Sequence, residues 1–82
     1  MAKEDNCDTG QYIDVQTLIA ENLKRLRKDN GWSQEHLAFE SDIDRSYIGY
    51  IENCKNNVTV KVLCELADAL NIKVDEFFAP ID

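Results

Sequence analysis

Five residues in a short stretch of the chain share one feature, a small or hydrogen-bonding side chain on the same side of an expected helix. They are Arg45, Ser46, Gly49, Tyr50 and Asn53. The spacing puts them opposite Ile48 and Ile51, which would face the interior. A guanidinium at the start of a helix can hydrogen-bond to guanine, and small neighbouring residues allow the helix to enter a major groove. The pattern therefore indicates base readout by a helix at about residues 45–53.

Five short helices are predicted to hold this face in place. Each begins where a polar N-cap follows an apolar residue, because the cap accepts a hydrogen bond from the first turn while the apolar residue packs on the fourth helical position. The four clear N-caps are Asp14, Ser33, Asp44 and Thr59. The fifth helix would start at Lys73, a poor cap, with Asp75 and Glu76 in a first turn whose positive end suits their charges.

The ends of these helices and one shared core complete an all-α arrangement. Gly31 and Asn71 follow the first and fourth helices, where a left-handed residue is wanted, and Asp42 stands in the turn before residue 45. Apolar residues recur at helical spacing on the first and fourth helices. They are Leu18, Ile19, Leu23, Leu26, Leu63, Leu66, Ala67 and Leu70. Cys64 is expected on the same apolar face, as a small buried residue.

Length and charge limit the functions open to the chain. Its 82 residues allow one small core and no second domain. Residues 1–12 have no periodicity and are expected to form a flexible N-terminal arm, with residues 80–82 as a C-terminal tail. The net charge is −7, which repels DNA at long range, but residues 1–16 and 60–82 each carry −3 of it. The central residues are therefore nearly neutral and could bind DNA, with an affinity that depends only weakly on the salt concentration.

The ordered set of residues resembles a known family. Residues 31–38 read GWSQEHLA, residues 44–48 read DRSYI, and residues 63–72 read LCELADALNI. This set is similar to the Cro/C1-type helix-turn-helix domain, or XRE family, the fold of phage repressors and many small bacterial regulators. The resemblance implies a compact five-helix, lambda-repressor-like DNA-binding domain over residues 13–79. The DRSYI segment is most similar to small stand-alone regulators, including controller proteins of restriction-modification systems.

The resemblance also implies which residues contact DNA. Base contacts are expected from Arg45, Ser46, Gly49 and Tyr50. Phosphate contacts are expected from Gln34, Tyr47, Asn53, Lys55, Asn56 and Asn57. Four of these residues have an alternative interpretation. Gln34 could be a plain helix former in the first turn. Arg45 could instead pair with a nearby carboxylate of residue 40, 42 or 44, Tyr47 could support the edge of the core, and Gly49 could be a tolerated surface glycine rather than a point of close approach.

The implied partner is double-stranded DNA, bound by a homodimer at a pseudo-palindromic operator. The expected dimer residues are Phe77, Phe78 and Ile81, because a final short helix cannot bury two adjacent phenylalanines in one small core. Repression by promoter occlusion is the simpler mode, and Glu35 could serve activation through a contact with RNA polymerase. The alternative function is a protein-interaction or antitoxin-like module on the same fold.

No other chemistry is indicated. The single histidine, His36, and scattered acids assemble no catalytic group, so we expect no enzyme, metal, cofactor or small-molecule ligand. An odd number of cysteines and no long apolar run indicate a cytoplasmic protein without a membrane span. A basic cluster late in the first helix is expected on a solvated face; it consists of Lys24, Arg25, Arg27 and Lys28. Its alternatives are a phosphate contact or a salt bridge from Arg27 to Glu52.

Overall fold

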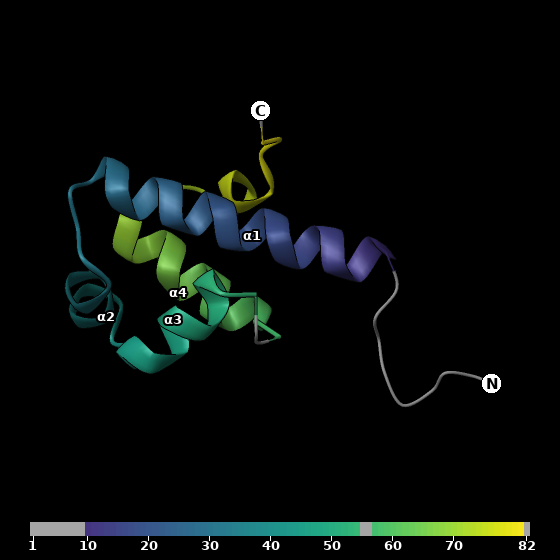
Figure 1. Ribbon diagram of the computed structural model, residues 1–82. Helices are drawn as coiled ribbons and strands as arrows, with labels where there is room; N and C mark the ends of the chain where they lie inside the picture. Colours follow the sequence, from purple (N-terminus) through teal and green to yellow (C-terminus); the bar gives the residue numbers. More distant parts are fainter. Residues whose placement is uncertain (1–9, 55–56, 82) are drawn as a thin grey trace.

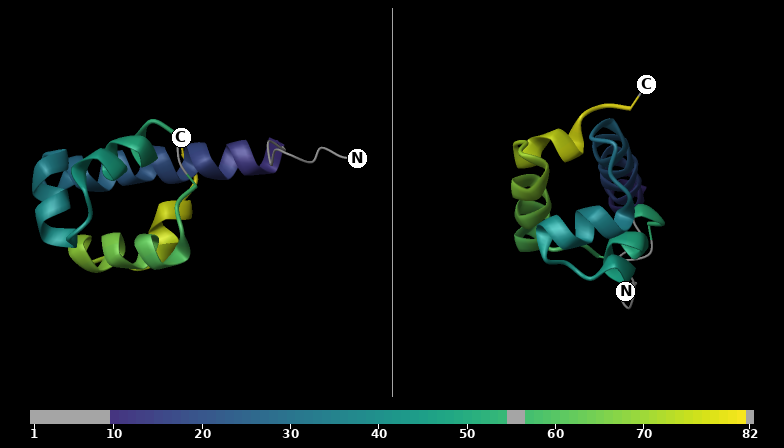
Figure 2. Two further views of the ribbon diagram at one scale, coloured as in Figure 1. Left: turned by 90° about the horizontal axis from the view of Figure 1, so that it is seen from below. Right: turned by 90° about the vertical axis from the view of Figure 1, so that its left-hand side faces the viewer.

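The computed structural model describes residues 10–54 and 57–81, which form four α-helices and one short 3-10 helix. They are α1 (Gly10–Asp29), α2 (Gln34–Ser41), α3 (Arg45–Glu52), α4 (Val60–Leu70) and the 3-10 helix η1 (Val74–Phe78). These elements pack in a closed circuit, in which α1 contacts α3 and η1, α2 contacts α3 and α4, and α4 contacts η1. Figure 1 shows α1 as the long element to which the others attach, and Figure 2 shows them enclosing one core.

The core is built from the apolar stripes that the sequence predicts. Its buried members are Ile19, Leu23, Leu26, Leu37, Ile48, Ile51, Leu63, Leu66, Ala67, Leu70 and Phe77. Leu18, which was also predicted, is only half-buried and is not a member of this cluster. Because every helix contributes at least one of these side chains, burial of the core fixes α3 against the rest of the domain.

Three of the predicted N-caps are confirmed. Ser33 Oγ accepts a hydrogen bond from His36 N at 3.0 Å, Asp44 Oδ1 from Ser46 N at 3.1 Å, and Thr59 Oγ1 from Val62 N at 3.1 Å. The predicted helix stops are also confirmed, since Gly31 and Asn71 have φ angles of 73° and 59°. The sequence therefore sets the start of α2, α3 and α4 through local hydrogen bonds.

The first and last predicted helices differ from the structure. α1 begins at Gly10, so residues 10–12 belong to a helix and not to an arm, and Asp14 lies inside it. A cap such as Asp14 favours a helix start but does not prevent the helix from extending further back, and no proline precedes it. The predicted fifth α-helix is the 3-10 helix η1, whose Lys73 makes no side-chain cap hydrogen bond, because lysine has no acceptor. Residues 1–9 of the predicted arm lie outside the described residues.

Two residues are placed differently from their predicted environments. Cys64 is exposed, because α4 buries positions 63, 66, 67 and 70 and the next residue after 63 points about 100° around the helix. Phe77 was predicted at a dimer interface but is fully buried in the chain's own core, so this part of the prediction was wrong. Its neighbours Phe78 and Ile81 are 42% and 50% exposed. The core therefore takes one phenylalanine of the pair and leaves the other at the surface.

Candidate nucleic-acid interface

The outer face of α3 presents the side chains that were predicted to read bases. Arg45, Ser46 and Tyr50 are exposed, while Ile48 and Ile51 on the opposite side are buried. The cap on Asp44 fixes the start of the helix, so Arg45 stands at its first position. A rigid helix with a polar, open face and a buried apolar face has the shape needed to lie in a major groove.

Arg45 has no carboxylate partner within residues 10–54 and 57–81. The ion pairs of the described residues use Lys24, Arg25, Arg27, His36 and Lys61, and none of them involves Arg45. The carboxylate of residue 40, which could have paired with Arg45, lies 3.3 Å from His36 Nε2 instead. The five guanidinium N–H groups of Arg45 are therefore available to an acceptor outside the chain.

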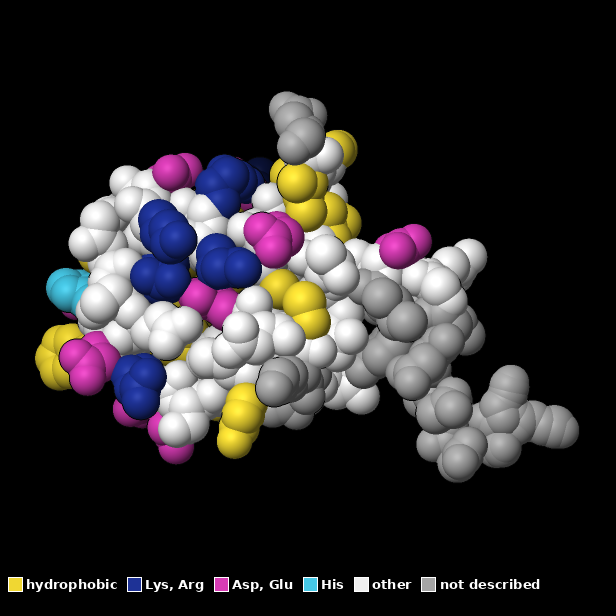
Figure 3. All heavy atoms as spheres, viewed as in Figure 1, with side chains coloured by type: hydrophobic (Ala, Val, Ile, Leu, Met, Phe, Trp, Pro, Cys, Tyr) yellow, Lys and Arg dark blue, Asp and Glu magenta, His cyan; other side chains and the backbone are white. Residues whose placement is uncertain are grey.

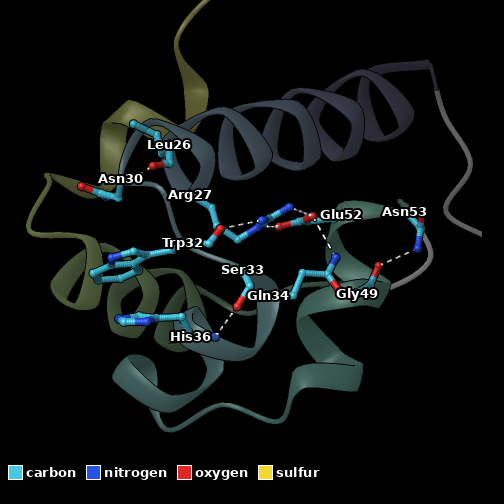
Figure 4. Close-up of polar contacts among 10 residues, drawn as sticks. All are labelled: Leu26, Arg27, Asn30, Trp32, Ser33, Gln34, His36, Gly49, Glu52 and Asn53. Atoms are coloured by element: carbon cyan, nitrogen blue, oxygen red, sulfur yellow. Dashed lines mark hydrogen bonds and ion pairs between the residues drawn. The ribbon is translucent and has the colours of Figure 1, made fainter.

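A buried network ties α3 to α1 and α2. Arg27 Nε and Nη2 donate to Glu52 Oε2 and Oε1 at 2.7 and 3.0 Å, and Nη1 donates to the carbonyl oxygen of Trp32 at 2.8 Å. Gln34 Nε2 donates to Glu52 Oε1 at 3.0 Å. Figure 4 shows these side chains converging from the end of α1, the start of α2 and the end of α3. The solvated face predicted for Arg27 is therefore wrong, and the alternative salt bridge to Glu52 is the observed contact.

Gln34 lies at the first position of α2, where the backbone N–H groups have no partner within a helix. Its contact with Glu52 also fixes the orientation of its amide, because a carboxylate accepts and only the NH2 group can donate. The second N–H of that group then remains for another acceptor. This is a suitable arrangement for a phosphate oxygen.

The other predicted phosphate contacts are placed to different degrees. Tyr47 packs against the core and donates its hydroxyl proton to the carbonyl oxygen of Asn57 at 3.3 Å, which matches its alternative interpretation as a core-edge residue. Asn53 is the C-cap of α3, and its Nδ2 donates to the carbonyl oxygen of Gly49 at 2.9 Å. Asn57 is exposed. Lys55 and Asn56 lie outside the described residues.

Gly49 is not required by the packing of the protein. A Cβ added there would have only Gln34 Oε1 within 4 Å, at 3.9 Å, which is an ordinary van der Waals contact. Its backbone is helical, so no left-handed conformation requires glycine either. Any need for glycine at this position must therefore come from a molecule that approaches α3 from outside.

Positive charge accompanies this face. Figure 3 shows Lys and Arg side chains gathered over the end of α1. Two of them are partly neutralised, since Lys24 pairs with Glu21 at 3.3 Å and Arg25 with Asp29 at 3.7 Å, whereas Lys28 has no carboxylate partner among the described residues. The predicted solvated face is confirmed for these three residues. Exposed pairs of this kind are screened by water and leave the surface able to attract anions.

The buried polar residue Asn22 was missed by the sequence analysis, and the salt bridge of the buried Arg27 was given only as an alternative. Asn22 is 2% exposed and Arg27 is 8% exposed. A signal for both was present: Asn22 follows Ile19 by three residues and Arg27 follows Leu23 by four, so each lies on the apolar stripe of α1. Polar residues at such positions are buried only where they find partners, and the partners come from distant segments that helical spacing does not reveal.

The geometry described above is that of a helix-turn-helix protein. A family model described as helix-turn-helix matches residues 23–77, and the chain belongs to this family of DNA-binding transcriptional regulators. The predicted resemblance is thereby confirmed. None of the helices in the described part of the chain is long and apolar enough to pass through a membrane.

Within the family, the chain is similar to controller proteins of restriction-modification systems. It is 43% identical over 63 residues to control protein C.SmaI of Serratia marcescens, which covers 77% of this chain and 75% of that protein. The crystal structure of controller protein C.AhdI from Aeromonas hydrophila has a TM-score of 0.75 and 41% identity, covering 77% of this chain and 96% of that one. The controller protein C.Esp1396I, solved as a tetramer in complex with its natural 35 base-pair operator, has a TM-score of 0.72 and 33% identity, covering 78% and 84%.

Proposed function

We propose that this chain is a cytoplasmic, sequence-specific transcriptional regulator, and not an enzyme, that binds a pseudo-palindromic operator as a homodimer. The observation that carries the proposal is Arg45, an exposed guanidinium without an ion pair in the described part of the chain, at the first position of a helix held by the Arg27–Glu52 network. Arg45 would bind the O6 and N7 of a guanine, with Ser46 and Tyr50 on the same face. Gln34 and Asn57 would hold the phosphates on either side.

The similarity to an operator-bound controller protein supports DNA as the partner. C.Esp1396I was solved on its natural operator, and this chain aligns with 84% of its length. The alignment supports a comparable docking of α3, with each protomer reading one half-site. In a two-fold dimer, the two recognition helices would lie about 34 Å apart, one turn of the duplex.

The apolar surface of η1 and the tail supports a second copy of the chain as the dimer partner. Phe78 and Ile81 are exposed, and Val74 on η1 lines a groove with Ile72 and Ala67. The rim of this groove carries Lys73, which has no ion pair among the described residues, beside two aspartates at positions 68 and 75. A two-fold axis would bring the lysine of one copy toward an aspartate of the other, which is the self-complementary pattern of an isologous interface.

Selection of bound sites from random DNA, followed by fluorescence anisotropy titrations on the selected site, tests the proposal. Arg45→Ala should lose about 1–3 kcal/mol of binding free energy and accept other bases at one position of each half-site. Lys28→Ala is the matched control, because Lys28 is also exposed and unpaired but lies on α1. Wild-type affinity of Arg45→Ala for the selected site would contradict base readout and favour the protein-interaction or antitoxin-like alternative.

Repression by occlusion of the promoter is the simpler mode of regulation, and α2 offers a second one. Glu35 is exposed in the first turn of α2, and Phe39, one turn later, is 82% exposed. An acidic and apolar pair on the outer side of a DNA-reading unit would suit a contact with a basic patch of RNA polymerase. In a transcription assay with the selected operator upstream of a promoter, Glu35→Lys should lose activation but keep operator affinity; unchanged activation would refute the contact.

A further inference from the structure

Asn22, in the middle of α1, holds the C-terminal segment by its side-chain amide. Nδ2 donates to the carbonyl oxygens of Phe77 and Ala79, both at 2.9 Å, and Oδ1 accepts from Arg25 Nη2 at 3.0 Å. Both N–H groups are therefore used, and the amide has one orientation, since carbonyls only accept and a guanidinium only donates. These contacts link residues that are more than fifty positions apart in the sequence.

We propose that Asn22 is a positioning residue for the dimer surface, an inference that rests on the proposed homodimer. Its two acceptors, the carbonyl oxygens of Phe77 and Ala79, lie on either side of Phe78 in the chain, so the amide holds the backbone before and after Phe78 and with it the direction of that side chain. The buried Phe77 ring anchors η1 to the core, and Ala79 N donates to the carbonyl oxygen of Glu76 at 3.3 Å within the segment itself. The Asn22 hydrogen bond to the carbonyl oxygen of Ala79 ties the end of this segment to α1 before a second copy arrives.

We call the two hydrogen bonds from Asn22 Nδ2 to the C-terminal segment the Asn22 clamp, and the position of Ile81 depends on this clamp as well. A hollow lies between α1 and the tail and is lined by Glu21, Asn22, Arg25, Pro80 and Ile81. Within this hollow the tail stands off α1, so the hydrogen bond to the carbonyl oxygen of Ala79 is the last one, among the described residues, that ties the tail to α1. A surface ordered in advance associates more tightly than one that must be ordered on binding.

The test compares dimer dissociation constants, measured by analytical ultracentrifugation of the full chain, with helical content and melting followed by circular dichroism. Asn22→Ala should weaken the dimer by about tenfold, because the exposed side chains of the tail must then be ordered during association. Arg25→Ala, the matched control, removes the contact to Oδ1 but leaves both clamp hydrogen bonds, and should leave the dimer within about twofold of wild type. Asn22→Ser, which retains a small polar group, replaces the alanine variant if that variant does not fold.

A second variant separates positioning from a general loss of stability. Phe78→Ala combined with Ile81→Ala should weaken the dimer by removing the contacts themselves, and adding Asn22→Ala to this double variant should weaken the dimer little further, because Asn22 acts through those two side chains. Additive losses, or a wild-type dimer constant in the folded Asn22 variants, would overturn the role of Asn22 while leaving the homodimer intact. A wild-type chain that stays monomeric both alone and on its operator would overturn the homodimer together with this inference.

Discussion

Replacing Arg27 by methionine tests whether the buried network, and not the core alone, holds α3, the proposed recognition helix. Methionine keeps most of the apolar length of the arginine side chain but removes every donor. It would leave the Glu52 carboxylate, whose side chain is 3% exposed, with Gln34 as its remaining side-chain partner. Trp32 would lose the donor to its carbonyl oxygen at the same time.

The expected loss is large compared with the stability of a chain of this size. Breaking a buried ion pair by removing one partner costs about 3–5 kcal/mol, because the remaining charge stays desolvated. A domain of this length has a free energy of unfolding of about 4–12 kcal/mol. The Arg27→Met variant should therefore lose about a quarter or more of its stability. Lys24→Met is the matched control on the same helix, since its 3.3 Å pair with Glu21 is solvent-exposed and contributes about 1 kcal/mol or less.

Urea denaturation followed by far-UV circular dichroism gives both free energies, and a double variant completes the cycle. Arg27→Met combined with Glu52→Leu leaves no buried charge, so its free energy of unfolding should return to within about 1 kcal/mol of wild type or exceed it. Operator affinity of the double variant should remain below that of the wild type although its stability is restored, because Gln34 has lost the acceptor that orients its amide. If Arg27→Met loses no more stability than Lys24→Met, the reasoning on the buried pair is wrong.

Three further predictions concern the DNA face. Gly49→Ala should stabilise α3 by about 0.5–1 kcal/mol, since a Cβ there has room, but weaken operator binding if the groove approaches closely; unchanged binding in anisotropy titrations would make the glycine a tolerated one. Asp42 has a φ of 59° in the turn between α2 and α3, so Asp42→Gly should raise the melting temperature, whereas Asp42→Asn should raise only operator affinity by removing a negative charge. With Lys55 as the cation among the expected phosphate contacts of each protomer, log–log salt titrations of a dimer should have a slope of about −2, and a slope beyond about −8 would contradict so few contacts.

The secondary structure could be predicted from the sequence wherever a local hydrogen bond decides it. Ser33, Asp44 and Thr59 each cap a helix by accepting a hydrogen bond from a backbone N–H two or three residues later. The contact that decides where the helix starts therefore lies within the same short segment of sequence. The exposed face of α3 follows from the same local logic, since burial of Ile48 and Ile51 fixes the side that Arg45 occupies. For these elements, the sequence and the structure agree because the forces act over a single turn.

The errors arise where a distant partner decides the outcome. Arg27 was expected in solvent because the sequence shows a run of basic residues, but Glu52, 25 residues later, draws it into the core. Phe77 and Phe78 have the same side chain, and only the packing of η1 against α1 decides which of them is buried. Asn22 was overlooked because its partners are backbone carbonyls, which carry no signature in a sequence.

The two polar residues buried on α1 have a joint consequence for operator recognition. Arg27 connects α1 to the proposed recognition helix α3 through Glu52, and Asn22 connects α1 to the segment that bears the proposed dimer surface. They lie five positions apart on one helix, at a rise of about 1.5 Å per residue, so a single rigid element links both surfaces. A dimer can read two half-sites one turn apart only if the distance between its recognition helices is fixed. In the proposed dimer, α1 would set that distance, and loosening either anchor should widen the range of half-site spacings that the protein accepts.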